Sequence, residues 1–174
     1  LPAEAKIVGE NYIKAVAEAC RSHLGSISGG GPIAVSLSGG MDSSGVLAVL
    51  LQVLEEDARS NPVHTFTLAI DGGGGDLAQA RQVISLLQPR FGRRLAHHEI
   101  VVNSNEVDHA ELVRRTGLMI EDYRVLDFGA AMAGVVLNDA IGRMYTRGEL
   151  PTIHHAFDGD GGNEVFLDYP LDHW

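Results

Sequence analysis

The stretch Ser36-Leu37-Ser38-Gly39-Gly40-Met41-Asp42-Ser43-Ser44 lies between two apolar runs, Pro32 to Val35 and Gly45 to Leu54. A short apolar run, a glycine pair and a longer apolar run predict a buried strand, a tight turn and the first turns of a helix. Backbone N–H groups and the dipole at a helix N-terminus bind phosphate without the help of a cationic side chain. The stretch therefore predicts a phosphate-binding loop.

This loop is not a Walker A sequence, because no lysine follows its glycines and both lysines of the chain lie upstream. Backbone amides and the hydroxyls of Ser38, Ser43 and Ser44 are left to bind phosphate oxygens. Asp42 would repel a phosphate unless a divalent cation lay between them, and Mg²⁺ prefers such oxygen ligands. The alternative is a plain strand-to-helix turn in which Asp42 or Ser43 caps the helix.

Strand-like and helix-like patterns alternate along the chain. Buried strands are expected at Ile33 to Leu37, Val63 to Ile70, Leu95 to Val102 and Ile153 to Phe157. Helices are expected at Ile7 to Leu24, Ser43 to Glu56, Leu77 to Leu87, Glu106 to Thr116 and Asp127 to Arg147. This alternation predicts an α/β fold, a parallel sheet with helices on both faces, whose ligands bind beyond the carboxyl ends of the strands.

Composition narrows the function classes. The 174 residues fit one domain, and the formal net charge of −10 argues against broad electrostatic binding to nucleic acid. No apolar run reaches the roughly 20 residues of a membrane span, and the chain does not start like a signal peptide. With Cys20 as its single cysteine, we expect a cytoplasmic protein of small-molecule chemistry that binds neither nucleic acid nor membrane.

A second glycine loop, Asp158-Gly159-Asp160-Gly161-Gly162-Asn163-Glu164, follows the fourth expected strand. Its glycines allow close approach of backbone to a ligand, and its acids can hold a metal or take a proton. A calcium loop of the EF-hand kind needs an acid at its twelfth position, counted from the first ligand Asp158, and Tyr169 stands there instead. Because both glycine loops follow strands of the expected parallel sheet, they are expected at the same edge of that sheet.

The histidines and arginines outside these loops are expected to be structural. We expect His98 to satisfy local hydrogen bonds, and we expect a structural role for His154 and His155 in the fourth strand. Arginines follow Pro89, in a segment expected to be a loop, and stand again at Arg114 and Arg115; all are expected on the solvated surface.

Ser38 to Ser44 resembles the SGGxDSS pyrophosphate loop of the N-type ATP pyrophosphatases. The second loop resembles the other signature of the asparagine synthetase and β-lactam synthetase group, and the motifs together cover roughly Ala34 to Tyr169. His64-Thr65-Phe66-Thr67-Leu68-Ala69-Ile70 resembles a strand of that family. The resemblance implies an adenine nucleotide α-hydrolase-like fold with ATP and Mg²⁺ as cofactors.

The resemblance also implies a role for individual residues. It places Leu68 beside the adenine, Asp158 and Gly159 at the adenylate, and Asp160 as the candidate catalytic base. Asp42 and Asn163 are the implied metal ligands, although the family has aspartate at the second position. ATP and pyrophosphate are expected to bind Ser36, Leu37, Ser38, Gly39, Gly40, Asp42, Ser43 and Ser44.

The expected substrate pocket departs from that of asparagine synthetase. Glu121-Asp122-Tyr123 resembles the family's Glu-Thr-Tyr, but the following stretch, Arg124 to Ala131, has small residues where an arginine and a serine would face an amino acid. The pocket is expected from Tyr123, Asp127, Gly129 and Glu164, and its substrate to be a larger acid than aspartate. The alternative for the small residues is tight helix packing.

The resemblance implies an AMP-forming carbon–nitrogen ligase that adenylates a carboxylic acid and passes the acyl group to an amine or to ammonia. The product would be an amide, a lactam or a peptide-like natural product such as an antibiotic. The family's catalytic lysine and glutaminase domain are missing from residues 1–174, so we expect an incomplete synthetase domain whose remaining part or subunit carries the lysine. The alternatives are another ATP pyrophosphatase, of the NAD synthetase, GMP synthetase or tRNA-modifying kind, and a non-catalytic nucleotide-binding module.

Overall fold

The structure, a computed structural model, describes residues 3–27, 30–121 and 125–159. Along the chain run α1 (Ala3–Ser26), β1 (Ile33–Ser36), α2 (Met41–Glu56), β2 (Val63–Ile70), α3 (Asp76–Phe91), β3 (Leu95–Val102), the 3-10 turn η1 (Ser104–Glu106), α4 (His109–Met119), α5 (Val125–Thr146) and β4 (His155–Phe157). Each expected strand and helix is present, with bounds shifted by up to three or four residues.

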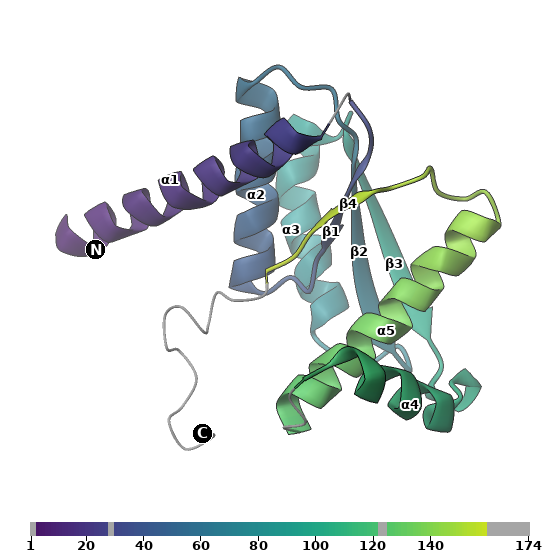
Figure 1. Cartoon of the computed structure of the whole chain (residues 1–174). Coiled ribbons are helices and arrows are strands. Elements are labelled where there is room, and N and C mark those ends of the chain that lie inside the picture. Colours follow the sequence, from purple (N-terminus) through teal and green to yellow (C-terminus); the bar gives the residue numbers. More distant parts are fainter. Residues whose placement is uncertain (1–2, 28–29, 122–124, 160–174) are drawn as a thin grey trace.

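The four strands of the described residues form one parallel sheet in the order β3-β2-β1-β4. In the register, Ile33 of β1 lies between Val63 of β2 and His155 of β4. All the carboxyl ends therefore lie at one edge, from which the loops into α2 and α3 emerge (Figure 1). The expected parallel α/β arrangement is confirmed.

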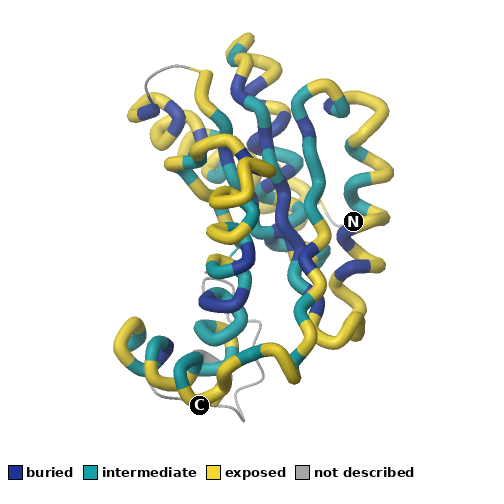
Figure 2. Tube along the Cα trace, turned by 90° about the vertical axis from the view of Figure 1, so that its right-hand side faces the viewer, coloured by how far each residue is buried: buried dark blue, intermediate teal, exposed yellow. Residues whose placement is uncertain are grey.

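One face of the sheet is covered by α1, α2 and α3 (Figure 1). The core there joins apolar side chains of all three helices with the inward side of β1, including Leu24, Leu47 and Val35, each fully buried. Figure 2 shows the buried positions concentrated along the strands. Burial of a leucine or valine side chain stabilises the fold by roughly 1.5–3 kcal/mol, so this layer holds the first helices to the sheet.

The opposite face is covered by α5, with α4 packed on α5 at the carboxyl-end side of the sheet (Figure 1). Phe66 and Ile100 of the sheet and Ala140 of α5 form a second buried cluster. The Arg115 guanidinium donates to both carboxylate oxygens of Asp139, at 2.6 and 2.9 Å, and so joins α4 to α5. Helices on both faces were expected, and they are observed.

The helix α3 is longer than expected. It continues through Pro89 to Phe91, because a proline in the last turn removes only one helical hydrogen bond before the chain turns at Gly92. The prediction of a loop after Pro89 was wrong for Arg90 and correct for Arg93 and Arg94, which lie in the turn before β3. Arg90 belongs to the helix and donates from its Nε to Glu55 of α2 at 3.1 Å.

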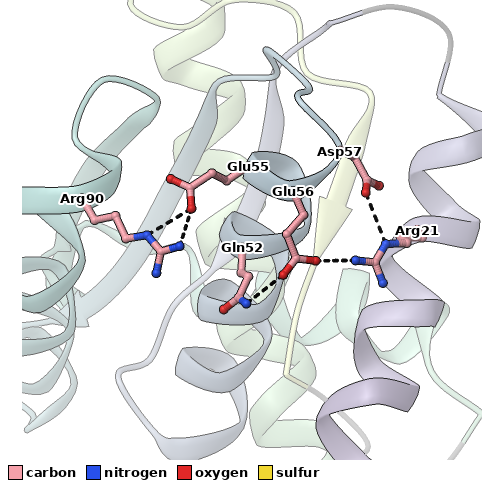
Figure 3. Close-up of polar contacts among 6 residues, drawn as sticks. All are labelled: Arg21, Gln52, Glu55, Glu56, Asp57 and Arg90. Atoms are coloured by element: carbon pink, nitrogen blue, oxygen red, sulfur yellow. Dashed lines mark hydrogen bonds and ion pairs between the residues drawn. The ribbon is translucent and has the colours of Figure 1, made fainter.

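At the amino end of the sheet, polar side chains join α1, α2 and α3 (Figure 3). Arg21 of α1 contacts Glu56 at 2.5 Å and Asp57 at 3.4 Å, while Arg90 reaches Glu55 from the other side. All of these side chains remain substantially exposed. The ion pairs therefore orient the helices from outside the core.

The N-terminal half of α1 extends beyond the other helices (Figure 1), and Ile7 and Ile13 are exposed there. Among the described residues, no helix combines the length and the apolar character that crossing a membrane requires.

Candidate functional site

The loop between β1 and α2 lies at the carboxyl end of the sheet, next to its centre. Ser36 ends β1, and Leu37, Ser38, Gly39 and Gly40 lead into the helix. Gly39 has φ +81°, and a Cβ atom there would lie 2.4 Å from the backbone nitrogen of Ala80 in α3. Only glycine fits this position, so the tip of the loop packs directly on the first turns of α3.

Hydroxyl groups connect the two sides of the loop. The oxygens Ser38 Oγ and Ser43 Oγ are 3.0 Å apart, and the Gly40 N–H donates to Ser38 Oγ at 3.3 Å. Ser43 is buried, and its hydroxyl also donates to the Gly40 carbonyl at 3.4 Å. These hydrogen bonds fix the conformation of the loop and bring the hydroxyls of Ser38 and Ser43 together.

No side chain caps the helix that follows. Gly40 is the N-cap residue, with extended backbone (φ −64°, ψ 168°) and no side-chain hydrogen bond to the first turn. The alternative in which Asp42 or Ser43 caps the helix is therefore wrong. The first N–H groups of a helix have no partner within it, so this end offers donors and a positive dipole to an anion.

The hydroxyl of Ser44 lies at the same end of α2. Its Oγ is buried and has no hydrogen-bond partner among the described residues. An unmade hydrogen bond at a buried hydroxyl costs stability, so such a group is usually explained by a ligand or by function. Ser44 is accordingly a candidate ligand-binding residue.

The second glycine loop begins against this helix end. A Cβ atom on Gly159 would lie 2.5 Å from the backbone nitrogen and 2.8 Å from the Cα of Ser43. The end of β4 lies next to the start of α2 in Figure 1. The structure therefore brings the first residues of the second loop, the exposed Asp158 and the half-buried Gly159, to the expected phosphate-binding loop.

The remaining expected site residues lie further out or outside the described part. Leu68 of β2 is half-buried and packs against the cluster on the α5 face. Gly129 lies in α5, where a Cβ atom would meet nothing within 4 Å, and Asp127 also lies in α5. Tyr123, Asp160, Asn163 and Glu164 lie outside the described residues.

Of the two expected metal ligands, only Asp42 is described. It is half-buried in the first turn of α2, where a carboxylate next to a phosphate needs a cation to offset the repulsion. Within the described ranges, no three side chains of histidine, cysteine, aspartate or glutamate are grouped to hold a metal. As a hard oxygen donor, the Asp42 carboxylate would suit Mg²⁺ as one ligand.

Two contacts of the loop between β1 and α2 were not predicted from the sequence. The Thr67 hydroxyl of β2 donates to the Leu37 carbonyl at 2.5 Å, and the first turns of α3 receive Gly39. Both contacts join segments about 30 to 40 residues apart in the chain. Threonine is common in strands for its β-branched side chain, so the sequence alone does not indicate that Thr67 bonds to the loop. That contact depends on how β1 and β2 are paired.

The histidines have the structural roles that were expected of His98 and His155. His64 Nδ1 and His98 Nε2 are 3.0 Å apart across β2 and β3, and His97 Nδ1 lies 2.9 Å from the Thr65 hydroxyl. Burial lowers the pKa of all three rings. His155 packs edge-on against His23 of α1, whereas His154, expected in the strand, precedes it and is exposed.

An open parallel sheet, with glycine loops meeting at the carboxyl ends of β1 and β4, defines the class of α/β proteins that bind ligands at this edge. Within it, the chain belongs to the asparagine synthase family, whose model matches residues 12–174. The asparagine synthetase (glutamine-hydrolyzing) of Gallus gallus is 29% identical over 133 residues, and that of Bos taurus 28%. These alignments cover 76% of the chain but 21% of either relative, so the chain spans about a fifth of their length.

Two solved structures resemble the chain at lower identity. NAD⁺ synthetase from Burkholderia pseudomallei aligns with a TM-score of 0.43 and 16% identity, over 82% of this chain and 59% of the other. The U34-tRNA thiolase NcsA from Methanococcus maripaludis, with its [4Fe-4S] cluster, aligns with a TM-score of 0.49 and 15% identity, over 91% and 63%. The family assignment rests on the sequence match, which confirms the resemblance drawn from the two loops and agrees with the fold that it implies.

Proposed function

We propose that the chain is the nucleotide-binding part of an ATP-dependent carbon–nitrogen ligase. One observation carries the proposal: Gly159 of the second loop lies on the uncapped end of α2, beside the hydroxyls of the first loop. The family assignment and the two glutamine-hydrolyzing asparagine synthetases support the same class of reaction.

In the proposed reaction, an oxygen of a substrate carboxylate attacks the α-phosphorus of ATP. The bond from the α-phosphorus to the bridging oxygen breaks, and pyrophosphate leaves with the electron pair. The amides of the first turn of α2 and the hydroxyls of Ser38, Ser43 and Ser44 would bind this leaving group. An amine then attacks the acyl-adenylate, AMP leaves, and the amine loses a proton as the amide forms.

The residues at this edge of the sheet would hold Mg²⁺, whose positive charge would offset that of the phosphates as pyrophosphate departs. In the described part of the chain, the half-buried Asp42 is the side chain suited to hold it, and Asn163 is the second ligand expected from the sequence. Asp160 is proposed as the base. These assignments follow the family motif.

The proposed substrate is a carboxylic acid larger than aspartate. Support comes from the small residues of Arg124 to Ala131 and from the open space around Gly129 in α5. The product would be an amide, a lactam or a peptide-like compound. The amine donor and any further segment or subunit that supplies the catalytic lysine belong to the same proposal.

The test is ATP–pyrophosphate exchange with MgATP and a panel of carboxylic acids, measured on the protein with any further segments of its natural chain. Exchange of labelled pyrophosphate into ATP, dependent on one acid and on Mg²⁺, is the expected result. Binding of ATP without exchange for any acid would favour the nucleotide-binding module instead. Exchange with an acid the size of aspartate but with no larger one would contradict the proposed substrate class.

A further inference from the structure

The root of the phosphate-binding loop is held by β2 through two hydrogen bonds to one residue. Leu37, the residue before Ser38, donates its N–H to the Phe66 carbonyl at 2.9 Å. Its own carbonyl accepts from the Thr67 hydroxyl at 2.5 Å. Leu37 and Thr67 are each 1% exposed, so water does not compete for these bonds.

The second bond, from the Thr67 hydroxyl to the Leu37 carbonyl, lies just beyond the last paired residues of β1 and β2. The pairing of β1 with β2 ends at Ser36 opposite Phe66, whereas β2 itself continues to Ile70. The N–H of Leu37 makes one more bond to β2, and the Leu37 carbonyl that follows belongs to a residue that is only 1% exposed. A buried carbonyl without a donor costs free energy, and the Thr67 side chain supplies that donor. The hydroxyl thus fixes the point at which the chain leaves the sheet.

The position of Leu37 sets that of the groups proposed to bind phosphate. Ser38 follows at once and contacts Gly40 and Ser43, and Gly39 is confined against Ala80. We infer that Thr67 is a positioning residue for the phosphate-binding loop: its hydroxyl holds Leu37 so that Ser38 and the first turn of α2 meet the pyrophosphate. The inference rests on the proposed function.

Thr65 provides a matched control within the same strand. It points to the same side of β2 as Thr67 and is fully buried. Its hydroxyl, however, lies 2.9 Å from His97 Nδ1 and 3.5 Å from the Ala96 carbonyl, both on β3. Loss of either hydroxyl removes a buried hydrogen bond, but only that of Thr67 is bonded to the loop.

The experiment compares Thr67→Val, Thr67→Ser and Thr65→Val with the wild type in calorimetric titrations with MgATP and with magnesium pyrophosphate. We expect Thr67→Val to raise both dissociation constants about three- to tenfold, the factor of one net hydrogen bond. Thr67→Ser and Thr65→Val should stay within about twofold of the wild type, because serine keeps the hydroxyl at position 67 and the Thr65 hydroxyl bonds to β3 instead of the loop. The melting temperature should fall in both valine variants, because each loses a buried hydrogen bond. If the Thr67 hydroxyl only stabilised the fold, the two valine variants would bind both ligands with the same affinity.

Equal affinities of Thr67→Val and Thr65→Val, with the wild type binding both ligands, would overturn the inference and leave the proposed function standing. Serine failing to restore affinity would also overturn it, because the hydroxyl would then not be the cause. A wild type that binds neither ligand would overturn the proposed function and the inference with it. If Thr67→Val does not fold, the pair Thr67→Ala and Thr65→Ala makes the same comparison.

Discussion

Ser44 has a buried hydroxyl oxygen with no partner at the end of α2 where the proposed phosphate would bind. A group of this kind reduces the stability of the ligand-free protein, because its desolvation is not offset by a hydrogen bond. The Ser44 hydroxyl is therefore expected to lower the stability of the ligand-free protein and to contribute to the binding of phosphate.

We expect Ser44→Ala to leave the melting temperature unchanged or to raise it, since the substitution removes an unsatisfied group. The same change should raise the dissociation constant for MgATP by about tenfold, the usual effect of one hydrogen bond to a charged ligand. Thermal unfolding and calorimetric titration give the two numbers. A clear fall in melting temperature would show that the hydroxyl has a structural partner.

Gly39 and Gly45 allow a second comparison between single residues. Gly39 has φ +81° and packs on Ala80, whereas Gly45 of α2 is exposed and has open space around it. Gly39→Ala should displace the loop from α3 and abolish measurable nucleotide binding. Gly45→Ala should preserve binding and stabilise the helix by about 0.5–1 kcal/mol. Binding and urea unfolding of both variants check the pair. Unchanged binding by Gly39→Ala would contradict the described loop.

At the level of the elements, α1, α2 and α3 are joined by exposed ion pairs outside and by leucines inside (Figure 3). Exposed ion pairs contribute little, because solvent screens the charges and ordering the side chains costs entropy. The packing of the apolar faces therefore holds this layer.

We expect Arg90→Gln, which breaks the pair with Glu55, to lower the free energy of unfolding by no more than about 1 kcal/mol, and by less in about 1 M salt. Leu47→Ala, at a fully buried position, should cost about 2–5 kcal/mol at either salt concentration. Urea unfolding at low and high salt measures both. A loss for Arg90→Gln as large as that for Leu47→Ala would show that the ion pairs, rather than the core, hold the helices.

The strands and helices were predictable because apolar runs and helical periodicity are local patterns; β2 and β3 have the expected bounds. The end of α3 was not predictable, because proline usually ends a helix and the sequence does not show that Pro89 lies in the last turn. The two glycine loops were found by motif. The bond from Thr67 to Leu37 and the contact of Gly39 with Ala80 were not, because they depend on register and packing between distant segments.

At the scale of the whole molecule, three histidines among the described residues have a shifted pKa that matters near neutral pH: His64, His97 and His98. Burial lowers the pKa of each below its ordinary value of 6.5; Glu99 opposes this at His97, and Arg81 adds to it. The unfolded chain therefore binds more protons than the folded one as the pH falls through 6.5. The three rings make the protein less stable in mild acid.

We expect the urea midpoint to fall as the pH is lowered through 6.5, where the histidines of the unfolded chain take up protons before those of the folded protein. The lowered pKa values of Glu99 and Asp139 act in the same direction, but only near and below their ordinary values of 4.5 and 3.8. Replacing His64 and His98 together by glutamine should flatten the dependence, whereas His154→Gln, at an exposed position, should not. A midpoint that stays constant or rises on acidification would contradict this assignment.

The contact of Gly159 with Ser43 has a consequence for the order in which the protein is made. The two loops meet only after β4 has paired with β1, and the partners Ile33 and His155 are 122 positions apart (155 − 33). Closing so long a segment is slow and entropically costly compared with forming a local turn. On the ribosome, the first loop emerges long before its counterpart, so a nascent chain acquires the complete nucleotide site only when its last described strand has left the exit tunnel and joined the sheet.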